Sequence, residues 1–333
     1  MTNELSPVAC SSSSKNILFV YYSQSGQLKQ VLDALAAPLA EYNCQWLELH
    51  PDPPYPFPWP FWEFLDCFPE TVLLDPPPLA DFQLPPDDRV DLIILGYQAW
   101  FLSPSPPITA FLKEPRVRTF LRGKRVITLV ACRNMWLKAH ETVSSMLNDM
   151  GARHIGHIAL TDQAPGMASF VTTPRWLLTG RKDAFWIFPP AGIAPEDIRN
   201  TARFGLAIQQ AFRSGLPLDE NLFKGLKAAP INPDYILPET MAHRGFMIWS
   251  RLIAKLSRPH TFRRRVLLFL YLTVLLAYII LVIPLLVLLR FLLTPLLKPV
   301  IAKKRQIYSR PSGEDDERLQ DFLAQLDSLR SDG

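Results

Sequence analysis

Residues Ile17–Leu35 read ILFVYYSQSGQLKQVLDAL, in which an apolar strand passes through a polar turn into a helix. Backbone N–H groups at the start of a helix have no partner inside it, and the helix dipole is positive there. The hydroxyl groups of Ser23 and Ser25 add hydrogen-bond donors, and Gly26 lets the chain turn tightly around an anion. The stretch therefore predicts a phosphate group bound where the first strand meets the first helix.

The chemistry of this turn favours a monophosphate. It lacks the lysine of the GxxxxGK[ST] loop and the spacing of GxGxxG, so it does not match a nucleoside-triphosphate or dinucleotide motif. The predicted phosphate ligands are neutral donors, namely Ser23, Gln24, Ser25, Gly26 and Gln27. The alternative is a serine N-cap that binds no ligand.

Apolar strands and amphipathic helices alternate from Lys15 to Ser214. The predicted strands are 16–22, 44–50, 91–96, 125–131 and 154–161, and the predicted helices are 28–42, 108–121, 137–150 and 195–214. Such alternation is typical of a parallel sheet with helices on both faces. We therefore predict an α/β fold, a doubly wound five-stranded parallel sheet, for a domain over residues 16–215.

Two long segments interrupt this pattern. Residues 51–89 and 162–194 are rich in proline and aromatic residues, including PYPFPWPFW and AFWIFPP. Long loops in compact domains are usually functional or disordered, and disordered segments rarely contain so many Trp and Phe. We expect ordered, apolar flaps.

The turn at Ser23–Gln27 resembles the first loop of flavodoxin-like FMN-binding domains, with Leu28 in place of that pattern's last threonine. The resemblance implies FMN as the cofactor and a ring bordered by two further loops, which follow the third and fourth strands. Ligands of doubly wound sheets bind beyond the carboxyl ends of the strands, where all three loops lie. The expected ring-side residues are Tyr97, Gln98, Ala99, Trp100, Cys132, Arg133, Asn134 and Trp136.

Two residues are candidates for catalysis. Arg133 would place positive charge beside the flavin, with an ordinary surface ion pair as the alternative. His157, on the last strand, would carry a proton, although histidines on strands are usually structural.

Composition excludes several classes of protein. The chain has 333 residues, a net charge of +4 and four cysteines without CxxC or metal-ligand spacing. These features predict neither a metal site nor a disulfide framework, and we find no nucleic-acid motif. Residues 1–15 are polar and are expected to be a disordered lead-in.

The C-terminal third contains an uncharged run, Val266–Leu289, long enough to cross a bilayer core of about 30 Å. We expect a connector over 216–240, a basic amphipathic membrane-surface helix over 241–262, a membrane-inserted segment over 263–302 and a charged tail with an amphipathic helix over 303–333. The alternative for 241–262 is a helix packed on the domain. The domain is expected on the cytoplasmic side of the inner membrane.

The path of the membrane segment is open at this stage. Basic residues lie on both sides of the run, so the positive-inside rule gives no orientation. Pro284, Pro295 and Pro299 would allow a re-entrant hairpin with both ends in the cytosol. A single span would instead place the acidic tail on the far side.

A narrower resemblance concerns residues outside the phosphate loop. The stretches YPFPWPFWEF (55–64), FPE (68–70) and CRNMW (132–136), with the C-terminal apolar segment, are similar to bacterial dialkylresorcinol condensing enzymes. This resemblance implies oxidation of a lipophilic cyclohexanedione to a dialkylresorcinol in lipid or aryl polyene biosynthesis, with a ketosynthase-like or acyl-carrier partner. A quinone reductase or electron-transfer flavoprotein, and a membrane scaffold that has lost FMN, are the alternatives.

Overall fold

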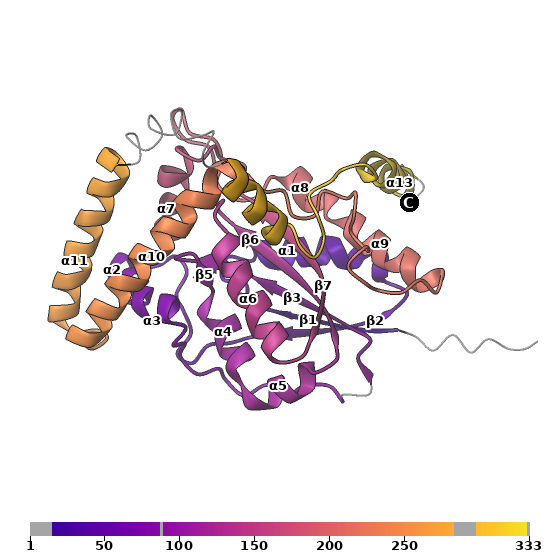
Figure 1. The fold of residues 1–333 in the computed structure, drawn as a ribbon, viewed down its shortest axis with the longest axis horizontal. Coiled ribbons are helices and arrows are strands. Elements are labelled where there is room, and N and C mark those ends of the chain that lie inside the picture. The colour runs from indigo at the N-terminus through magenta and orange to yellow at the C-terminus, as the bar shows by residue number, and fades with distance from the viewer. Residues whose placement is uncertain (1–14, 87–88, 283–297, 332–333) are drawn as a thin grey trace, which may run out of the picture.

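The computed structural model describes residues 15–86, 89–282 and 298–331, and a parallel five-stranded sheet lies at its centre (Figure 1). The strand order is β2-β1-β3-β6-β7. The strands are β1 (Asn16–Tyr21), β2 (Asn43–Glu48), β3 (Leu92–Tyr97), β6 (Arg125–Cys132) and β7 (Arg153–Thr161). This is the order of flavodoxin-like doubly wound sheets, so the predicted fold class is confirmed. Residues 1–14 of the predicted lead-in lie outside the described residues.

Parallel pairing explains the apolar composition of the central strands. β1 pairs with β2 on one side and with β3 on the other, placing Ile17 beside both Cys44 and Leu92. Every residue of β3 is buried. A parallel strand covered on both faces needs apolar side chains at every position, which is why LIILGY reads as a continuous run.

Helices cover the two faces of the sheet in separate sets. The first face carries α1 (Gln27–Ala36), η1 (Ala37–Leu39), α8 (Pro195–Asn200) and α9 (Ala202–Arg213). The second face carries α4 (Pro106–Lys113), α5 (Pro115–Leu121) and α6 (Leu137–Asp149). Prolines divide the predicted helices, since α1 gives way to a 3₁₀ turn containing Pro38 and α5 begins at Pro115.

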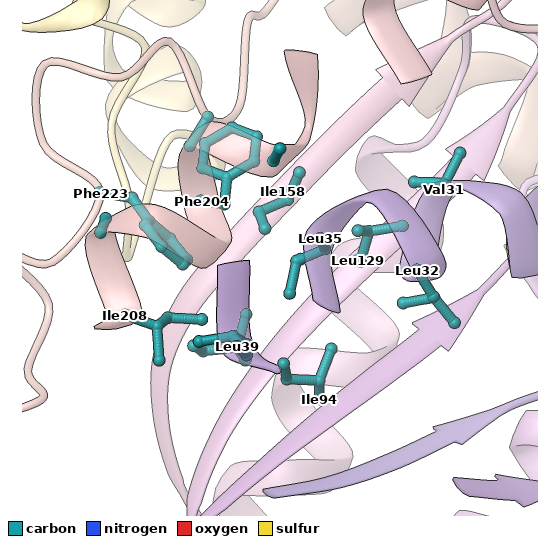
Figure 2. Packing of buried hydrophobic residues seen from close by; sticks show 14 of the residues in the cluster. Val31, Leu32, Leu35, Leu39, Ile94, Leu129, Ile158, Phe204, Ile208 and Phe223 are labelled. Carbon is teal, nitrogen blue, oxygen red and sulfur yellow. The ribbon is translucent and has the colours of Figure 1, made fainter. Parts of the chain in front are cut away.

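The first face is closed by tight contact between two helices and the sheet. Figure 2 shows Leu35 of α1, Phe204 and Ile208 of α9 and Leu129 of β6 meeting in one apolar cluster. A Cβ placed on Gly205 would lie 2.0 Å from the backbone oxygen of Leu35. Only glycine allows α9 to approach α1 this closely. The helices on this face of the sheet are therefore tightly packed against each other.

Both proline-rich and aromatic insertions contain short helices, as expected of ordered flaps. The first holds α2 (Phe61–Asp66) and α3 (Phe68–Leu73), and the second holds α7 (Ser169–Thr179). A small hairpin, β4 (Ala99–Trp100) with β5 (Ser103–Pro104), follows β3. These elements gather around the carboxyl ends of the strands.

The C-terminal third is helical and partly docked on the domain. It contains α10 (Pro233–Leu256), α11 (Phe262–Ala277), the π turn η3 (Tyr278–Val282), a helix over 298–308 and α13 (Leu319–Ser331). α10 begins inside the predicted connector and packs against α3 and α6, so the predicted surface helix over 241–262 also lies on protein. The bends predicted at Pro284 and Pro295 fall outside the described residues.

Candidate functional site

The turn after β1 presents polar groups to solvent. Gly26 has a φ of 79°, and a Cβ added there would meet no atom within 4 Å. Ser25 and Gly26 are exposed, and Ser23 Oγ accepts a hydrogen bond from the Lys29 N–H at 3.3 Å. The first turn of α1 contains no acidic residue. The donor set and the helix dipole therefore suit an anion, as the sequence predicts.

Two glutamines of this turn bind other parts of the protein. Gln24 Nε2 donates to the Pro56 carbonyl oxygen at 3.2 Å, joining the turn to the aromatic flap. Gln27 is buried: its Oε1 accepts from the Ile193 N–H at 3.1 Å, and its Nε2 donates to the Ile193 oxygen at 3.4 Å. The prediction that the Gln27 side chain is a phosphate ligand is therefore wrong, because that side chain holds a neighbouring loop in place.

The turn after β3 brings aromatic rings to the same edge of the sheet. Trp100 packs edge-to-face against Tyr22, Tyr55 and Trp59, with ring centres 6.1, 5.4 and 5.7 Å away. Trp100 and Tyr55 remain half-buried, so part of each ring faces outward. Tyr97 is fully buried, and burial raises the pKa of its hydroxyl. The geometry is consistent with the predicted role at the ring for Trp100, whereas the Tyr97 side chain lies in the core and leaves only its backbone for that role.

Gln98 and Ala99 lie between those two aromatic residues and are half-buried. The Gln98 carbonyl oxygen accepts from the Ser105 N–H at 2.9 Å, which closes the β4–β5 hairpin. The Gln98 side-chain oxygen is buried and has no hydrogen-bond partner among the described residues.

The turn after β6 meets α7. The Arg133 guanidinium lies over the ring of Phe170 at 4.1 Å, and its Nε donates to Asn134 Oδ1 at 3.4 Å. Asn134 Nδ2 in turn donates to Ser169 Oγ at 3.5 Å. Burial lowers the pKa of Arg133, with Asp162 nearby acting in the opposite direction. Arg133 and Asn134 thus lie at the predicted edge of the sheet, with Arg133 stacked on α7.

Ten buried polar side-chain atoms have no hydrogen-bond partner within the described part of the chain, and three of them belong to segments that flank this edge. These three are Trp59 Nε1 of the aromatic flap, Gln98 Oε1 of the β3 turn and Thr172 Oγ1 of α7. Ser169 and Thr172 are one helical turn apart, and they are the buried residues of α7. Buried polar atoms are nearly always hydrogen-bonded in folded proteins, so these three atoms are available to a polar ligand at this edge.

Asp162, a residue that sequence analysis overlooked, ties the loops together. Its N–H donates to the Arg133 oxygen at 2.9 Å, and its carboxylate accepts from the N–H groups of Ala164 at 2.7 Å and Gly192 at 2.8 Å. Burial raises its pKa. The available signal was its position, because it directly follows the last strand at the edge where doubly wound sheets bind ligands.

His157 and Trp136 do not reach this edge, and both predictions are wrong. His157 is fully buried and stacks on His140, with ring centres 3.7 Å apart, while its Nδ1 lies 2.8 Å from Thr128 Oγ1. Trp136 is also buried and packs beside His157. Burial lowers the pKa of His157 well below its ordinary value, so its imidazole is neutral. Its role is structural.

Cys132 and Glu239 lie behind the β6 turn. Burial raises the pKa of the Cys132 thiol, which keeps it protonated and unreactive. Glu239 of α10 is buried, and its Oε1 accepts from the Lys138 N–H at 2.7 Å, capping α6. Burial raises the pKa of Glu239 to about 8. Cys132 contributes to the shape of the predicted site and not to its chemistry.

No protein-family model matches this sequence, and no curated protein matches it. Among solved structures, flavodoxin 1 from Bacillus cereus is similar at 17% identity and a TM-score of 0.32, covering 61% of this chain and 100% of that one. A flavoprotein in complex with FMN from Lactobacillus acidophilus shows 18% identity and a TM-score of 0.35, covering 44% of this chain and 93% of that one.

General stress protein 14 in complex with FMN from Treponema denticola shows 9% identity and a TM-score of 0.32, covering 59% of this chain and 99% of that one. Because these scores are low, the assignment of the fold rests on the strand order of this chain.

Proposed function

We propose that this chain binds FMN at the carboxyl edge of its sheet and acts as a membrane-attached oxidoreductase. The observation that carries the proposal is the joint placement of an anion-binding turn and unpaired buried polar atoms at one edge. Ser25 and Gly26 provide the donors for a monophosphate. Trp59 Nε1, Gln98 Oε1 and Thr172 Oγ1 provide one donor, one acceptor and one hydroxyl for a polar heterocycle.

The residues at this edge have the chemistry that this cofactor needs. FMN, when bound, supplies a ring that accepts two electrons as a hydride. The chain contributes position and charge: the half-buried faces of Trp100 and Tyr55 border the ring, and Arg133 brings a cation to the same edge. Asp162 links the turn after β6 to the loop at Gly192, so hydrogen bonds hold the loops of the site in place.

A lipophilic substrate fits the surroundings of this edge. Phe61 and Trp62 of α2 are exposed large apolar residues, and α2 contacts the apolar helix α11. A substrate dissolved in a membrane would reach the site along these exposed side chains of α2. The proposed reaction is a two-electron oxidation that removes two hydrogens from a dialkylated cyclohexanedione and leaves the aromatic resorcinol; bound FMN would supply the electron acceptor.

The partner that supplies such a substrate would be a ketosynthase-like or acyl-carrier protein, acting at the cytoplasmic face of the inner membrane. The partner and its location are proposed because residues 55–64 and 132–136 resemble dialkylresorcinol condensing enzymes.

Cofactor binding is tested by comparing FMN with riboflavin, which lacks the phosphate. Quenching of flavin fluorescence by the detergent-purified chain should show FMN binding at least about tenfold tighter, because the turn holds the phosphate. Ser25→Asp places a negative charge in the exposed turn and should abolish that preference while riboflavin binding stays unchanged. Ser214→Asp, at an exposed position after α9, is the matched control. Equal affinity for both flavins, or no binding of either, would overturn the proposal.

Substrate class is tested with the FMN-loaded protein. Anaerobic bleaching of flavin absorbance by a long-chain 2,5-dialkylcyclohexane-1,3-dione, with the matching dialkylresorcinol as product, supports the proposed reaction. Steady oxidation of NAD(P)H by a quinone without turnover of the dione would favour a quinone reductase. A protein that stays colourless after FMN is added would instead be a scaffold.

A further inference from the structure

The exposed surface of α11 is apolar on most sides. The helix Phe262–Leu281 is long and apolar enough to cross a membrane, and 17% of its apolar window is buried in the protein. The exposed large residues include Phe262, Phe269, Leu270, Val274 and Leu276. Figure 1 shows α11 at one end of the molecule, beside α10 and away from the sheet. A soluble protein rarely leaves such a surface in water.

Charge identifies the occupant of this surface as a lipid bilayer. Arg263 and Arg265 are exposed at the start of α11, and Lys298 and Lys303 are exposed where the described chain resumes. Cations at both limits of an apolar segment suit the anionic headgroup layer, whereas a second protein copy would not require them.

Beyond residue 298 the chain is again part of the domain. Tyr308, Phe322 and Leu326 are buried, the last two within the same core cluster as α1 and α9. Figure 1 shows α13 next to α9. Gln325 of α13 and Gln210 of α9 share a hydrogen bond of 2.8 Å. The tail therefore belongs to the fold.

Backbone pairing makes this return specific. The Lys227 N–H donates to the Asp315 oxygen at 2.7 Å, and the Arg318 N–H donates to the Gly225 oxygen at 2.8 Å. Ser312 Oγ accepts from the His157 N–H at 2.6 Å. Because β7 is the last strand of the sheet, Ser312 caps an edge N–H that would otherwise lack a partner.

Separating the tail from the domain would carry a large cost. It would expose Phe322 and Leu326, which are both buried in the main core. It would also leave the buried His157 N–H without its acceptor Ser312. A single membrane span would require this separation, because it would put the tail and the domain on opposite sides.

We propose that α11 anchors the chain in the bilayer and that both described ends of the apolar segment, the start of α11 and the residues from 298 onward, lie on the same side of the membrane as the domain. The anchor thus has both basic limits on one side of the membrane, the arrangement that the positive-inside rule favours for the cytoplasm. The proposal is independent of FMN binding.

The first test cross-links the tail to the domain in intact membranes. The full chain carrying Gln210→Cys and Gln325→Cys is treated with a short bifunctional maleimide, which suits a pair whose side chains touch. We expect an intramolecular cross-link that changes mobility on a denaturing gel. The single variants, and the pair Lys113→Cys with Gln325→Cys on opposite faces of the sheet, are the controls and should not shift.

The second test determines sidedness. The cysteines introduced at positions 210 and 325 should react equally with a membrane-impermeant maleimide in inverted vesicles, and neither should react in sealed spheroplasts. Labelling from opposite sides, with no cross-link, would establish a single span and overturn the proposal. Recovery of the full chain in the soluble fraction would also overturn it, because a bilayer would then not be the partner of α11.

Discussion

The domain binds the two ends of its apolar segment in different ways. The exit is the start of α11, and the return is the chain from residue 298 onward. At the exit, Arg264 of α11 is fully buried and pairs with Asp66 Oδ1 at 2.8 Å and with Glu70, both on the first flap. At the return, Phe322 and Leu326 are buried in the main core, and Ser312 binds the backbone of β7. Charge fixes one attachment, and apolar burial with neutral hydrogen bonds fixes the other.

This difference shows why two helices of the C-terminal third are covered to different extents. α13 has an apolar stripe that meets α9, so docking removes that stripe from water. α11 is apolar on nearly all sides, so contact with α2 and α10 buries only a small part of its surface. A buried ion pair positions α11 without covering it, and the remaining apolar surface is the part that we propose lies in lipid.

Lowering the pH should reduce the free energy of unfolding more than any of the substitutions. It should do so by weakening the attachment of the C-terminal tail to the domain. His140, whose Nε2 lies 3.0 Å from the Arg310 oxygen, packs with His154 and His157 beneath the tail. Burial lowers the pKa of His140 to about 4 and that of His154 to about 3, and it also lowers the pKa of His157.

The sign follows from proton binding. The unfolded chain takes up protons below pH of about 6.5 while the folded cluster stays neutral, so stability is lost as pH falls below that value. Each histidine contributes about 1.4 kcal/mol per pH unit, or roughly 5 kcal/mol for three between pH 7 and 5. Urea midpoints at several pH values measure this slope. His154→Asn should reduce it by about one proton, and exposed His50→Gln should not; a flat profile would contradict the prediction.

Removing the ion pairs of Arg264 should cause the next largest loss of stability. Arg264→Leu leaves Asp66 and Glu70 without their buried partner and should lower the free energy of unfolding by about 3–5 kcal/mol. Guanidinium titration in detergent measures the loss. Arg263→Leu removes a neighbouring exposed arginine and should change stability by less than about 0.5 kcal/mol. Similar values for the two variants would show that the ion pair contributes little.

Truncating the return helix should cost somewhat less. Leu326→Ala removes a buried side chain from the core shared with α9 and should destabilise by about 3 kcal/mol. Leu329→Ala on the same helix, where the side chain is 59% exposed, should stay within about 0.5 kcal/mol. Thermal unfolding of both variants gives the comparison, and equal midpoints would mean that α13 is not docked in solution.

The smallest effect should come from one hydrogen bond at the sheet edge. Ser312→Ala leaves the His157 N–H without its acceptor and should cost about 1–2 kcal/mol. Hydrogen exchange at the His157 amide should speed up in the same variant, while exposed Ser328→Ala should leave it unchanged. An unchanged exchange rate in Ser312→Ala would mean that another group protects this amide.

Local patterns predicted the sheet and the tight turn at Gly26 well, because both depend on neighbouring residues. Strand 92–97 is apolar at each position since it is buried on both faces, and Gly26 adopts the positive φ that the turn needs. The same burial removed any alternation from β7, so sequence could not show which way His157 points. Its direction away from the site depends on α6 and on the tail, which are distant in sequence.

Sequence alone determined that this chain has a doubly wound sheet, a tight polar turn between its first strand and first helix, and an apolar segment of membrane length. Those features arise from hydrophobic periodicity and turn chemistry over short stretches. Tertiary structure alone decided that Gln27 and His157 serve the scaffold, that Asp162 braces the loops, and that the tail lies on the domain. Each of these depends on contacts between residues far apart in the chain, whose partners no local pattern specifies.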